Sequence, residues 1–358
     1  PLFNARSCDA CHPDGSRGKF EFWADGTIKG DSLLLKVGAG KYGDPIYGGQ
    51  IQPRAVSGIE GEGQPAVRFE KIRDPSGTML RKPVFELRDP AYGPLSEKSL
   101  IAGRVSPALH GFGDLEKVSE QTLIALSDPE DKNGDGISGR INRVTLFDGS
   151  TALGRFGWKA AQWSLEVQTG KAFRMDMGMS SKIMGPAWGD CTPRQKACYS
   201  AAHGERPRND GREISNNVIK LVTDSVLDLV PTPPRGADPE GKQVFRQIGC
   251  AACHIPEVPL DDGGTSRMYT DLLLHDTGPG LADGFVEGSA GSGEWRTAPL
   301  MGLGWLMKKK EFLLHDGRAR DVREAILWHG GEAAGAAQAY RDLENSQRYS
   351  LHRFLGTL

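Results

Sequence analysis

The chain contains Cys8-Asp-Ala-Cys11-His12 near its start and repeats the pattern as Cys250-Ala-Ala-Cys253-His254. Two thiols at this spacing add to the vinyl groups of a haem, and the adjacent histidine is carried under the iron as an axial ligand. Cys-x-x-Cys alone also occurs in zinc ribbons, so the rival interpretation is zinc held by four cysteines. Zinc pairs rarely carry histidine at the next position twice over. The motifs therefore predict two covalently bound haems c, with His12 and His254 as iron ligands.

The 358 residues suggest about two domains and permit a well-buried core. A formal net charge of -2 gives no reason to expect nucleic acid or an anionic membrane as a partner. No apolar run approaches the roughly 20 residues that a membrane span needs. The chain starts at Pro1 without an initiator methionine or a signal peptide, which indicates a mature or trimmed form. Because covalent haem attachment implies export, the expected compartment is the bacterial periplasm.

The two remaining cysteines are Cys191 and Cys198. In an oxidising compartment such a closely spaced pair predicts a short-loop disulfide. The alternative interpretation is a free, redox-active dithiol.

The clearest domain boundary is the proline-rich stretch 231–237, Pro-Thr-Pro-Pro-Arg-Gly-Ala. Such a stretch cannot continue a helix and is typical of a semi-rigid connector. Ser215 before it and Asp238-Pro239 after it predict the starts of two helices. The sequence thus predicts an N-terminal haem domain, 1–235, and a C-terminal cytochrome c-like domain, 236–358. In the second domain a helix, the haem motif and one closing amphipathic helix follow in the order of a small cytochrome c.

Three stretches of the first domain alternate like strands, namely 32–37, 66–72 and 83–87. Glycine and proline interrupt them often, so we expect a small antiparallel sheet or hairpins on a helical domain. The predicted fold class is therefore mainly α, with two cytochrome c-like haem domains and an antiparallel β excursion in the first.

One segment of the second domain begins with His315-Asp-Gly, continues with a capping box at Asp321 and Glu324, and ends with His329 before two glycines. This segment resembles the C-terminal half of the bacterial di-haem cytochrome c peroxidases. In that family a methionine fourteen residues after the His-Asp-Gly histidine ligates the C-terminal haem, and His329 occupies this position. The resemblance implies a His/His iron that relays electrons at low potential, with His315 as a pocket residue. The alternative for His329 is a surface histidine at a helix end.

The segment from Phe156-Gly-Trp158 to Leu-Glu-Val-Gln168 resembles another stretch of the same family. By this resemblance Trp158 matches the tryptophan between the two haems, and Gln168 matches a distal-pocket amide. Asp176-Met-Gly-Met stands where the family has Glu-Met-Gly-Met, so Asp176 takes the role of the acid/base that helps to split the peroxide O–O bond. Aspartate is one methylene shorter than glutamate, and the alternative is a solvated acid beside core methionines.

The sixth ligand of the first haem is left open by the sequence. Peroxidases of this family carry a blocking histidine on a loop after the first motif, and no histidine occurs here between His12 and His110. We expect an open or weakly held site, with His110, Met175 and Met177 as candidate ligands.

Asp131-Lys-Asn133-Gly-Asp135-Gly spaces three oxygen ligands and a turn glycine as calcium loops do. An EF-hand has a bidentate acid at its twelfth position, where this chain has Asn142. The alternatives are a calcium site and a plain turn rich in Asp and Asn.

Across nearly its whole length the chain resembles the di-haem oxidoreductase family, described as peroxidases or thiol oxidoreductases. The resemblance is carried by residues 1–8, 134–139, 154–159, 270–276 and 325–332. It implies a peroxidase-like enzyme whose first haem reacts with hydrogen peroxide or another small oxidant. A redox partner protein donates the electrons, which the second haem relays. The alternatives are an oxidase of a partner protein's tryptophan residues and a pure electron-transfer cytochrome with two six-coordinate haems.

Overall fold

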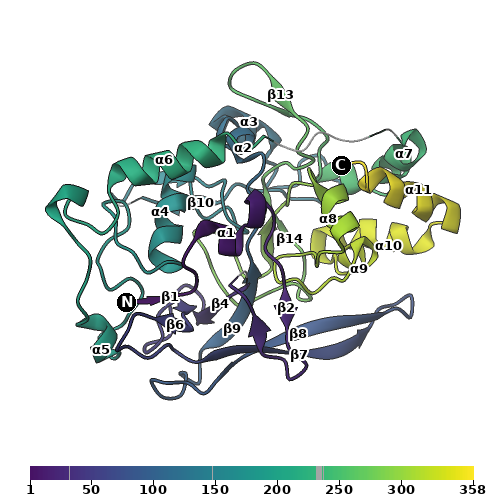
Figure 1. Ribbon diagram of the computed structural model, residues 1–358. Coiled ribbons are helices and arrows are strands. Elements are labelled where there is room, and N and C mark those ends of the chain that lie inside the picture. The colour runs from purple at the N-terminus through teal and green to yellow at the C-terminus, as the bar shows by residue number, and fades with distance from the viewer. Residues whose placement is uncertain (32, 147, 231–235, 237) are drawn as a thin grey trace.

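The computed structural model describes residues 1–31, 33–146, 148–230, 236 and 238–358, and Figure 1 shows how its elements are arranged. The α-helices of this part are α1 (Cys8–Cys11), α2 (Phe112–Glu116), α3 (Glu120–Leu126), α4 (Leu165–Met175), α5 (Lys196–Tyr199), α6 (Asn216–Leu227), α7 (Pro239–Gln247), α8 (Leu303–Lys309), α9 (Val322–Leu327), α10 (Ala334–Asp342) and α11 (Asn345–Leu355). The strands are β1 (Leu2–Phe3), β2 (Glu21–Phe22), β3 (Ile28–Lys29), β4 (Leu33–Gly38), β5 (Gln50–Ile51), β6 (Arg54–Ala55), β7 (Gln64–Arg73), β8 (Met79–Arg88), β9 (Leu100–Val105), β10 (Arg143–Thr145), β11 (Thr151–Leu153), β12 (Val258–Pro259), β13 (Thr265–Ser266), β14 (Leu274–Asp276) and β15 (Glu294–Arg296).

The prediction of a mainly α, cytochrome-like fold is wrong. Helix accounts for only 28% of the protein and strand for 21%, distributed over short helices and many small sheets. The physical reason is the composition of the chain, whose 47 glycines and 22 prolines favour turns and interrupt regular hydrogen bonding. The haem motifs and their flanking helices are local features, and they did not determine the class of the whole chain.

Side-chain caps start three helices where the sequence predicts them. Ser215 caps α6, Asp238 caps α7 and Asp321 caps α9, and each accepts a hydrogen bond from the backbone N–H three residues later. The single closing helix predicted for the C-terminus is instead two helices, α10 and α11. They separate at Leu343, which is extended (φ -62°, ψ 145°).

Helices α7 and α11 cross closely beside the second motif. A Cβ atom on Gly241 of α7 would lie 2.0 Å from the carbonyl oxygen of Ser350 in α11, so only glycine permits this approach. Phe245 of α7 packs edge-on against Phe354 of α11, with ring centroids 5.4 Å apart. The crossing forms one wall of the core around residues 250–254.

All strand pairs of the described part are antiparallel. Strands β5, β4 and β9 form its three-stranded sheet, and the other sheets have two strands. The three predicted strands fall on β4, β7 and β8, although residue 32 lies outside the described residues. In β4 the side chains of Leu33, Leu35 and Val37 are buried, as expected for a strand with one face on the core.

A long ribbon made of β7 and β8 runs below the C-terminal helices in Figure 1. Asp74 at its tip accepts two hydrogen bonds from Arg341 of α10, at 2.9 and 2.7 Å, across 267 residues of sequence. Nearer its base, Arg81 donates to the carbonyl oxygen of Arg318 at 2.9 Å. The ribbon thus links the first third of the chain to its last part.

The buried clusters combine residues from both predicted domains. Leu80 of β8 packs in the same cluster as Val244 and Phe245 of α7. Phe112 of α2 shares a second cluster with Met268, while a third cluster lies around β4. The proline-rich stretch lies outside the described residues except for Gly236, so the division into 1–235 and 236–358 stays a prediction.

Cys191 and Cys198 form a disulfide, with Cα atoms 6.1 Å apart, which confirms that prediction. The four cysteines of the two motifs are free. Among the described residues, no helix has the length and apolar character required to cross a bilayer.

Glu62 is a carboxyl group buried beside β5, with 1% of its surface exposed. It accepts hydrogen bonds from the backbone N–H of Gln52, at 2.6 Å, and from the side chain of Gln195. Burial raises the pKa of Glu62 to about 8, although both hydrogen bonds oppose the shift. The folded protein therefore keeps a proton on Glu62 at pH values where the unfolded chain has released it.

Replacing Glu62 by glutamine is expected to flatten the pH dependence of stability. Between the ordinary pKa of 4.5 and the folded pKa of about 8, the folded state binds one proton more than the unfolded state. The wild-type free energy of unfolding therefore carries a term that falls by about 1.4 kcal/mol per pH unit as the pH rises. Urea unfolding across this range measures the slope. The exposed Glu97→Gln variant should keep the wild-type slope, and an unchanged slope in Glu62→Gln would contradict the expectation.

Candidate functional site

The first motif is a single helical turn, α1, capped by Ser7. Cys8 is exposed and Cys11 is buried. The Nδ1 atom of His12 lies 2.8 Å from the carbonyl oxygen of Pro107, which assigns its proton to Nδ1 and leaves the lone pair on Nε2. Burial lowers the pKa of His12, so the ring is neutral near pH 7. This is the state in which histidine ligates a metal.

Asp176 lies beside this motif, at the C-terminal end of α4. Its Oδ1 accepts a hydrogen bond from Gln50 Nε2 at 2.9 Å, and Gln50 also donates to Asn4 Oδ1 at 2.7 Å. Burial raises the pKa of Asp176 to about 6, while the hydrogen bond from Gln50 and the charge of Lys171 lower it. Burial and then the charge of Asp176 raise the pKa of Cys11 to about 12, which places the carboxyl close to the attachment thiols.

A cavity of about 270 Å³ borders this network and is lined in part by Asn4, Asp31 and Arg54. Asp31 also accepts the thiol hydrogen bond of Cys11 at its carbonyl oxygen, at 2.9 Å. The cavity therefore adjoins the attachment helix on the side of the Asn4–Gln50–Asp176 network.

Gln168 lies close to the residue that precedes Trp158, and the roles of both residues stay predictions. The Oε1 atom of Gln168 is 3.8 Å from the position of a Cβ atom on Gly157, the residue before Trp158. Trp158 donates its indole N–H to the carbonyl oxygen of Val105 at 2.8 Å. Its ring meets His315 edge-on, with centroids 6.4 Å apart. Trp158 thus connects the segment before α4 to the His315 segment of the second half.

The candidate sixth ligands of the first haem lie around the same motif. The imidazole of His110 packs against Gly15, with its Cε1 atom 3.1 Å from the position of a Cβ atom there. The carbonyl oxygen of Met175 accepts hydrogen bonds from Gln50 and Gln52 at 3.1 and 2.9 Å. The choice among an open site, His110, Met175 and Met177 stays a prediction.

The second motif follows α7, after Gly249 in a left-handed conformation (φ 87°). His254 Nδ1 lies 3.0 Å from the carbonyl oxygen of Tyr269, and His329 Nδ1 lies 2.7 Å from that of Ala325. Both rings therefore keep the lone pair on Nε2. Burial lowers the pKa of His254 to about 4. The hydrogen bond to the Tyr269 carbonyl oxygen opposes this shift, and the charge of His329 adds to it. Ligation of one iron by both histidines stays a prediction.

Beside this motif, a histidine lies between two carboxylates, and sequence reasoning assigned it no role. His275 contacts Asp271 through Nε2 and Glu332 through Nδ1, each at 2.8 Å. Burial opposes its charge, but the hydrogen bonds to Asp271, Cys253 and Glu332 raise the pKa of His275 to about 12. Glu332 lies three residues after His329, so this ion-pair network holds the segment of that candidate ligand. The sequence signal that could have indicated a role for His275 is the presence of histidine and acidic residues in both 270–276 and 325–332, two of the segments that carry the family resemblance.

Among the described residues, Cys253, Asp271 and His275 form the one group of three His, Cys, Asp or Glu side chains with ligand atoms within 4.8 Å of one another. The predicted calcium loop is arranged as a turn. Asp131 Oδ2 accepts from Gly136 N at 3.1 Å, and Asp135 Oδ1 accepts from Ile137 N at 2.9 Å. Calcium binding at Asp131, Asn133 and Asp135 stays a prediction.

Two Cys-x-x-Cys-His segments, each with a neutral histidine beside free thiols, define a protein built to hold two haems. A family model described as "di-haem oxidoreductase, putative peroxidase" matches residues 72–358. The chain belongs to this family, which confirms the family predicted from the motifs, and it is an oxidoreductase with haem cofactors. The matched residues include the second motif, while the first motif precedes them. No curated protein and no solved structure matches the chain significantly.

Proposed function

We propose that this di-haem oxidoreductase is a periplasmic peroxidase that carries both haems covalently. The first haem is held by residues 8–12 and the second by residues 250–254, with His12, His254 and His329 as iron ligands. A redox partner protein donates electrons, the second haem relays them, and hydrogen peroxide is reduced at the first.

The attachment residues fit two haems c. The four motif thiols are free, whereas the other two cysteines form a disulfide. His12, His254 and His329 each direct Nδ1 at a backbone carbonyl and keep Nε2 for a metal. Burial lowers the pKa of all three rings, which keeps them neutral. Neutral, oriented imidazoles beside paired free thiols are the donor set that this cofactor requires.

The observation that carries the peroxidase proposal is the partly buried carboxyl group of Asp176 beside the first motif. A bound haem supplies the redox-active iron at which peroxide is reduced. Converting hydrogen peroxide to two water molecules consumes two electrons and two protons, and a proton has to move from one peroxide oxygen to the other. A pKa of about 6 lets Asp176 both accept and release that proton near neutral pH. The hydrogen bonds recorded among the described residues engage Oδ1, so Oδ2 is the oxygen assigned to this transfer.

Trp158 is assigned the exchange of electrons between the two halves. Its indole is fixed by the hydrogen bond to Val105 and meets the buried ring of His315. His315 stacks on Trp295 with ring centroids 3.6 Å apart and an interplanar angle of 12°. This aromatic group lies between the segment leading to α4 and the segment leading to α9, which carry the candidate residues of the first and second haems.

The direct test is a spectrum of the oxidised protein together with a haem count. We expect two haems per chain that resist extraction by acidic organic solvent. We also expect one low-spin and one high-spin component, and a reaction on mixing with hydrogen peroxide. Bound zinc or extractable haem would remove the basis of the proposal. Two low-spin haems that do not react with peroxide would instead identify an electron-transfer cytochrome.

Replacing Trp158 by phenylalanine is expected to slow electron exchange between the haems and to leave the first encounter with peroxide at the wild-type rate. Phenylalanine is harder to oxidise than tryptophan and loses the hydrogen bond to Val105. Stopped-flow absorbance, recorded at the bands of both haems, separates the two phases. Trp305→Phe, at an exposed tryptophan of α8, is the matched control and should leave both phases unchanged. If both kinetic phases have the same rates in the Trp158 variant and in the wild type, Trp158 does not carry electrons between the haems.

A further inference from the structure

Five basic side chains are buried around Trp158, His315 and Trp295. We call them the cationic cluster: Arg17, Arg104, Lys159, Arg296 and Arg318, which are at most 7% exposed. The guanidinium of Arg17 lies 5.3 Å from the ring centroid of Trp158. The guanidinium of Arg104 and the ammonium of Lys159 lie 4.6 and 4.3 Å from the ring centroid of Trp295. So many buried cations require compensating charge, because burying an unpaired ion costs several kcal/mol.

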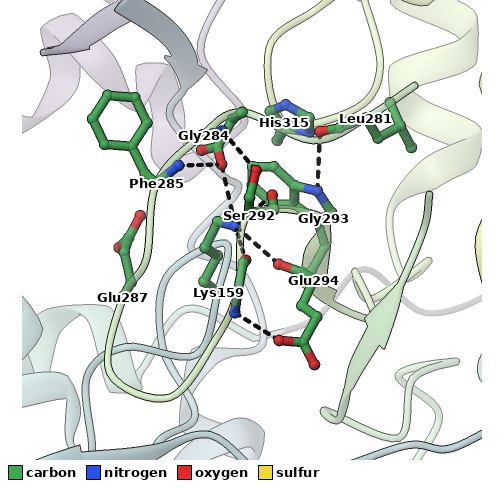
Figure 2. A network of polar contacts seen from close by, with 12 residues as sticks. Lys159, Leu281, Gly284, Phe285, Glu287, Ser292, Gly293, Glu294 and His315 are labelled. Carbon is green, nitrogen blue, oxygen red and sulfur yellow. Dashed lines mark hydrogen bonds and ion pairs between the residues drawn. The ribbon is translucent and has the colours of Figure 1, made fainter. Parts of the chain in front are cut away.

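Three members of the cluster have protein carboxylates as partners. Arg104 and Lys159 share Asp283, and Arg318 pairs with Asp316. Figure 2 shows the segment Leu281–Glu294 folded around Lys159, whose ammonium also donates to the carbonyl oxygens of Gly291 and Ser292 at 2.6 and 3.0 Å. These three charges are accounted for within the chain.

Arg17 and Arg296 are different. Within the described part of the chain, neither guanidinium lies within 4.0 Å of a carboxylate oxygen. Arg17 donates to the carbonyl oxygens of Phe312 and Leu314, and Arg296 donates to those of Gly157 and Thr297. Each guanidinium has five N–H donors, so these contacts use fewer than half of them. Burial lowers the pKa of both arginines to about 10. The charges of Asp316 and Glu311 oppose this shift at Arg17, and the charge of Asp271 opposes it at Arg296.

Their positions relate each arginine to one motif. Arg17 follows His12 by five residues and lies over Trp158. Arg296 is joined to the same residue through the backbone, since its N–H donates to the carbonyl oxygen of Trp158 at 3.0 Å. The next residue, Thr297, accepts the hydroxyl of Thr270 at 2.6 Å, and Thr270 follows the Tyr269 whose carbonyl oxygen orients His254. Arg17 thus belongs to the surroundings of the first motif and Arg296 to those of the second.

We propose that Arg17 and Arg296 bind propionate carboxylates of the two haems, Arg17 those of the first haem and Arg296 those of the second. A haem carries two carboxylates, and a planar guanidinium binds a carboxylate through two parallel hydrogen bonds. Such partners account for the unused donors of both arginines and for the absence of an ion pair to either guanidinium among the described residues. The assignment rests on the covalent haem attachment proposed above and is independent of the peroxidase activity.

The test is the midpoint potential of each haem in the holoprotein, measured by spectroelectrochemical titration. A nearby cation favours the reduced iron, which carries one positive charge less. Arg17→Gln is therefore expected to lower the potential of the first haem alone, and Arg296→Gln that of the second alone. Resonance Raman spectra should show a shifted propionate band for the same haem. Arg17→Lys and Arg296→Lys keep the charge but lose the paired geometry, so they should shift the band while largely retaining the potential.

Arg341→Gln is the matched control, because this half-buried arginine is already paired with Asp74. It should leave both potentials and both propionate bands unchanged. If the glutamine variants load two haems and keep wild-type potentials and bands, the proposal is wrong. If added chloride or phosphate changes the potentials of the glutamine variants but not those of the wild type, an inorganic anion occupies the site and the proposal is wrong. Where a glutamine variant fails to load haem, the lysine variant decides through its propionate band. These outcomes can still be measured if the wild-type protein does not react with hydrogen peroxide, so failure of the peroxidase proposal is distinguishable from failure of this one.

Discussion

Asp176→Asn is expected to slow the reaction with hydrogen peroxide by about 10²–10⁴-fold, the usual contribution of a general acid–base group. Asparagine retains the size of the side chain and its contact with Gln50, but it cannot accept and return a proton. Both haems should remain attached, and the spectrum of the second haem should be unchanged. Stopped-flow mixing of the variant with peroxide measures the rate.

Asp190→Asn provides a matched control for this experiment. Asp190 is also partly buried, with a pKa raised to about 6 by burial, and it accepts hydrogen bonds from the backbone N–H groups of Gly49 and Gln50 in the same region. It shares the chemistry of Asp176, but its hydrogen bonds among the described residues do not involve the first motif. We expect the Asp190 variant to react at the wild-type rate. If both variants are slowed equally, the loss reflects damage to the β5 region, and the role of Asp176 as proton carrier is wrong.

His329→Met is expected to raise the potential of the second haem by a large part of the roughly 0.8 V range that axial ligands span. A thioether stabilises reduced iron relative to an imidazole, and the position at the end of α9 is retained. Redox titration should show one potential moved and the other unchanged, and the low-spin spectrum should take on methionine-ligated character.

The exposed His203 supplies the comparison for this substitution. His203→Met should leave both potentials in place, because its ring contacts Glu205 at the surface and, among the described residues, neither Cys-x-x-Cys-His motif. If His329→Met also leaves both potentials and the low-spin spectrum unchanged, His329 is not a ligand. The peroxide reaction of the first haem then provides independent evidence for or against the proposed function.

Features with local causes could be predicted from the sequence. The starts of α6, α7 and α9 depend on one capping side chain each, and the sequence places Ser215, Asp238 and Asp321 correctly. The disulfide closes between residues only seven apart. The prediction of the fold class failed because the class depends on how glycine- and proline-rich segments pair with one another. A short alternation of apolar residues predicts a strand but does not specify which strand it pairs with. The prediction of one continuous closing helix failed for a related reason, because the helical spacing of apolar residues continues across the break at Leu343.

Parts of the candidate site could not be predicted from the sequence either. The motifs are visible because attachment needs residues adjacent in sequence. Gln50 meets Asp176 across 126 residues, and His275 meets Glu332 across 57. Contacts at such separations depend on the tertiary arrangement. Arg17 and Arg296 carry no motif at all, and only their burial without a carboxylate distinguishes them from other arginines.

The β7–β8 ribbon has a consequence for how this chain matures. Its contacts with Arg318 and Arg341 join residues more than two hundred positions apart, and contacts of this range form slowly because a long loop must close first. During synthesis the ribbon is made well before its partners, so it has nothing to dock on until almost the entire chain has emerged. Ribbon docking is therefore a late event. Under the covalent attachment proposed above, the time before it is when both pairs of thiols would be most accessible to attachment enzymes.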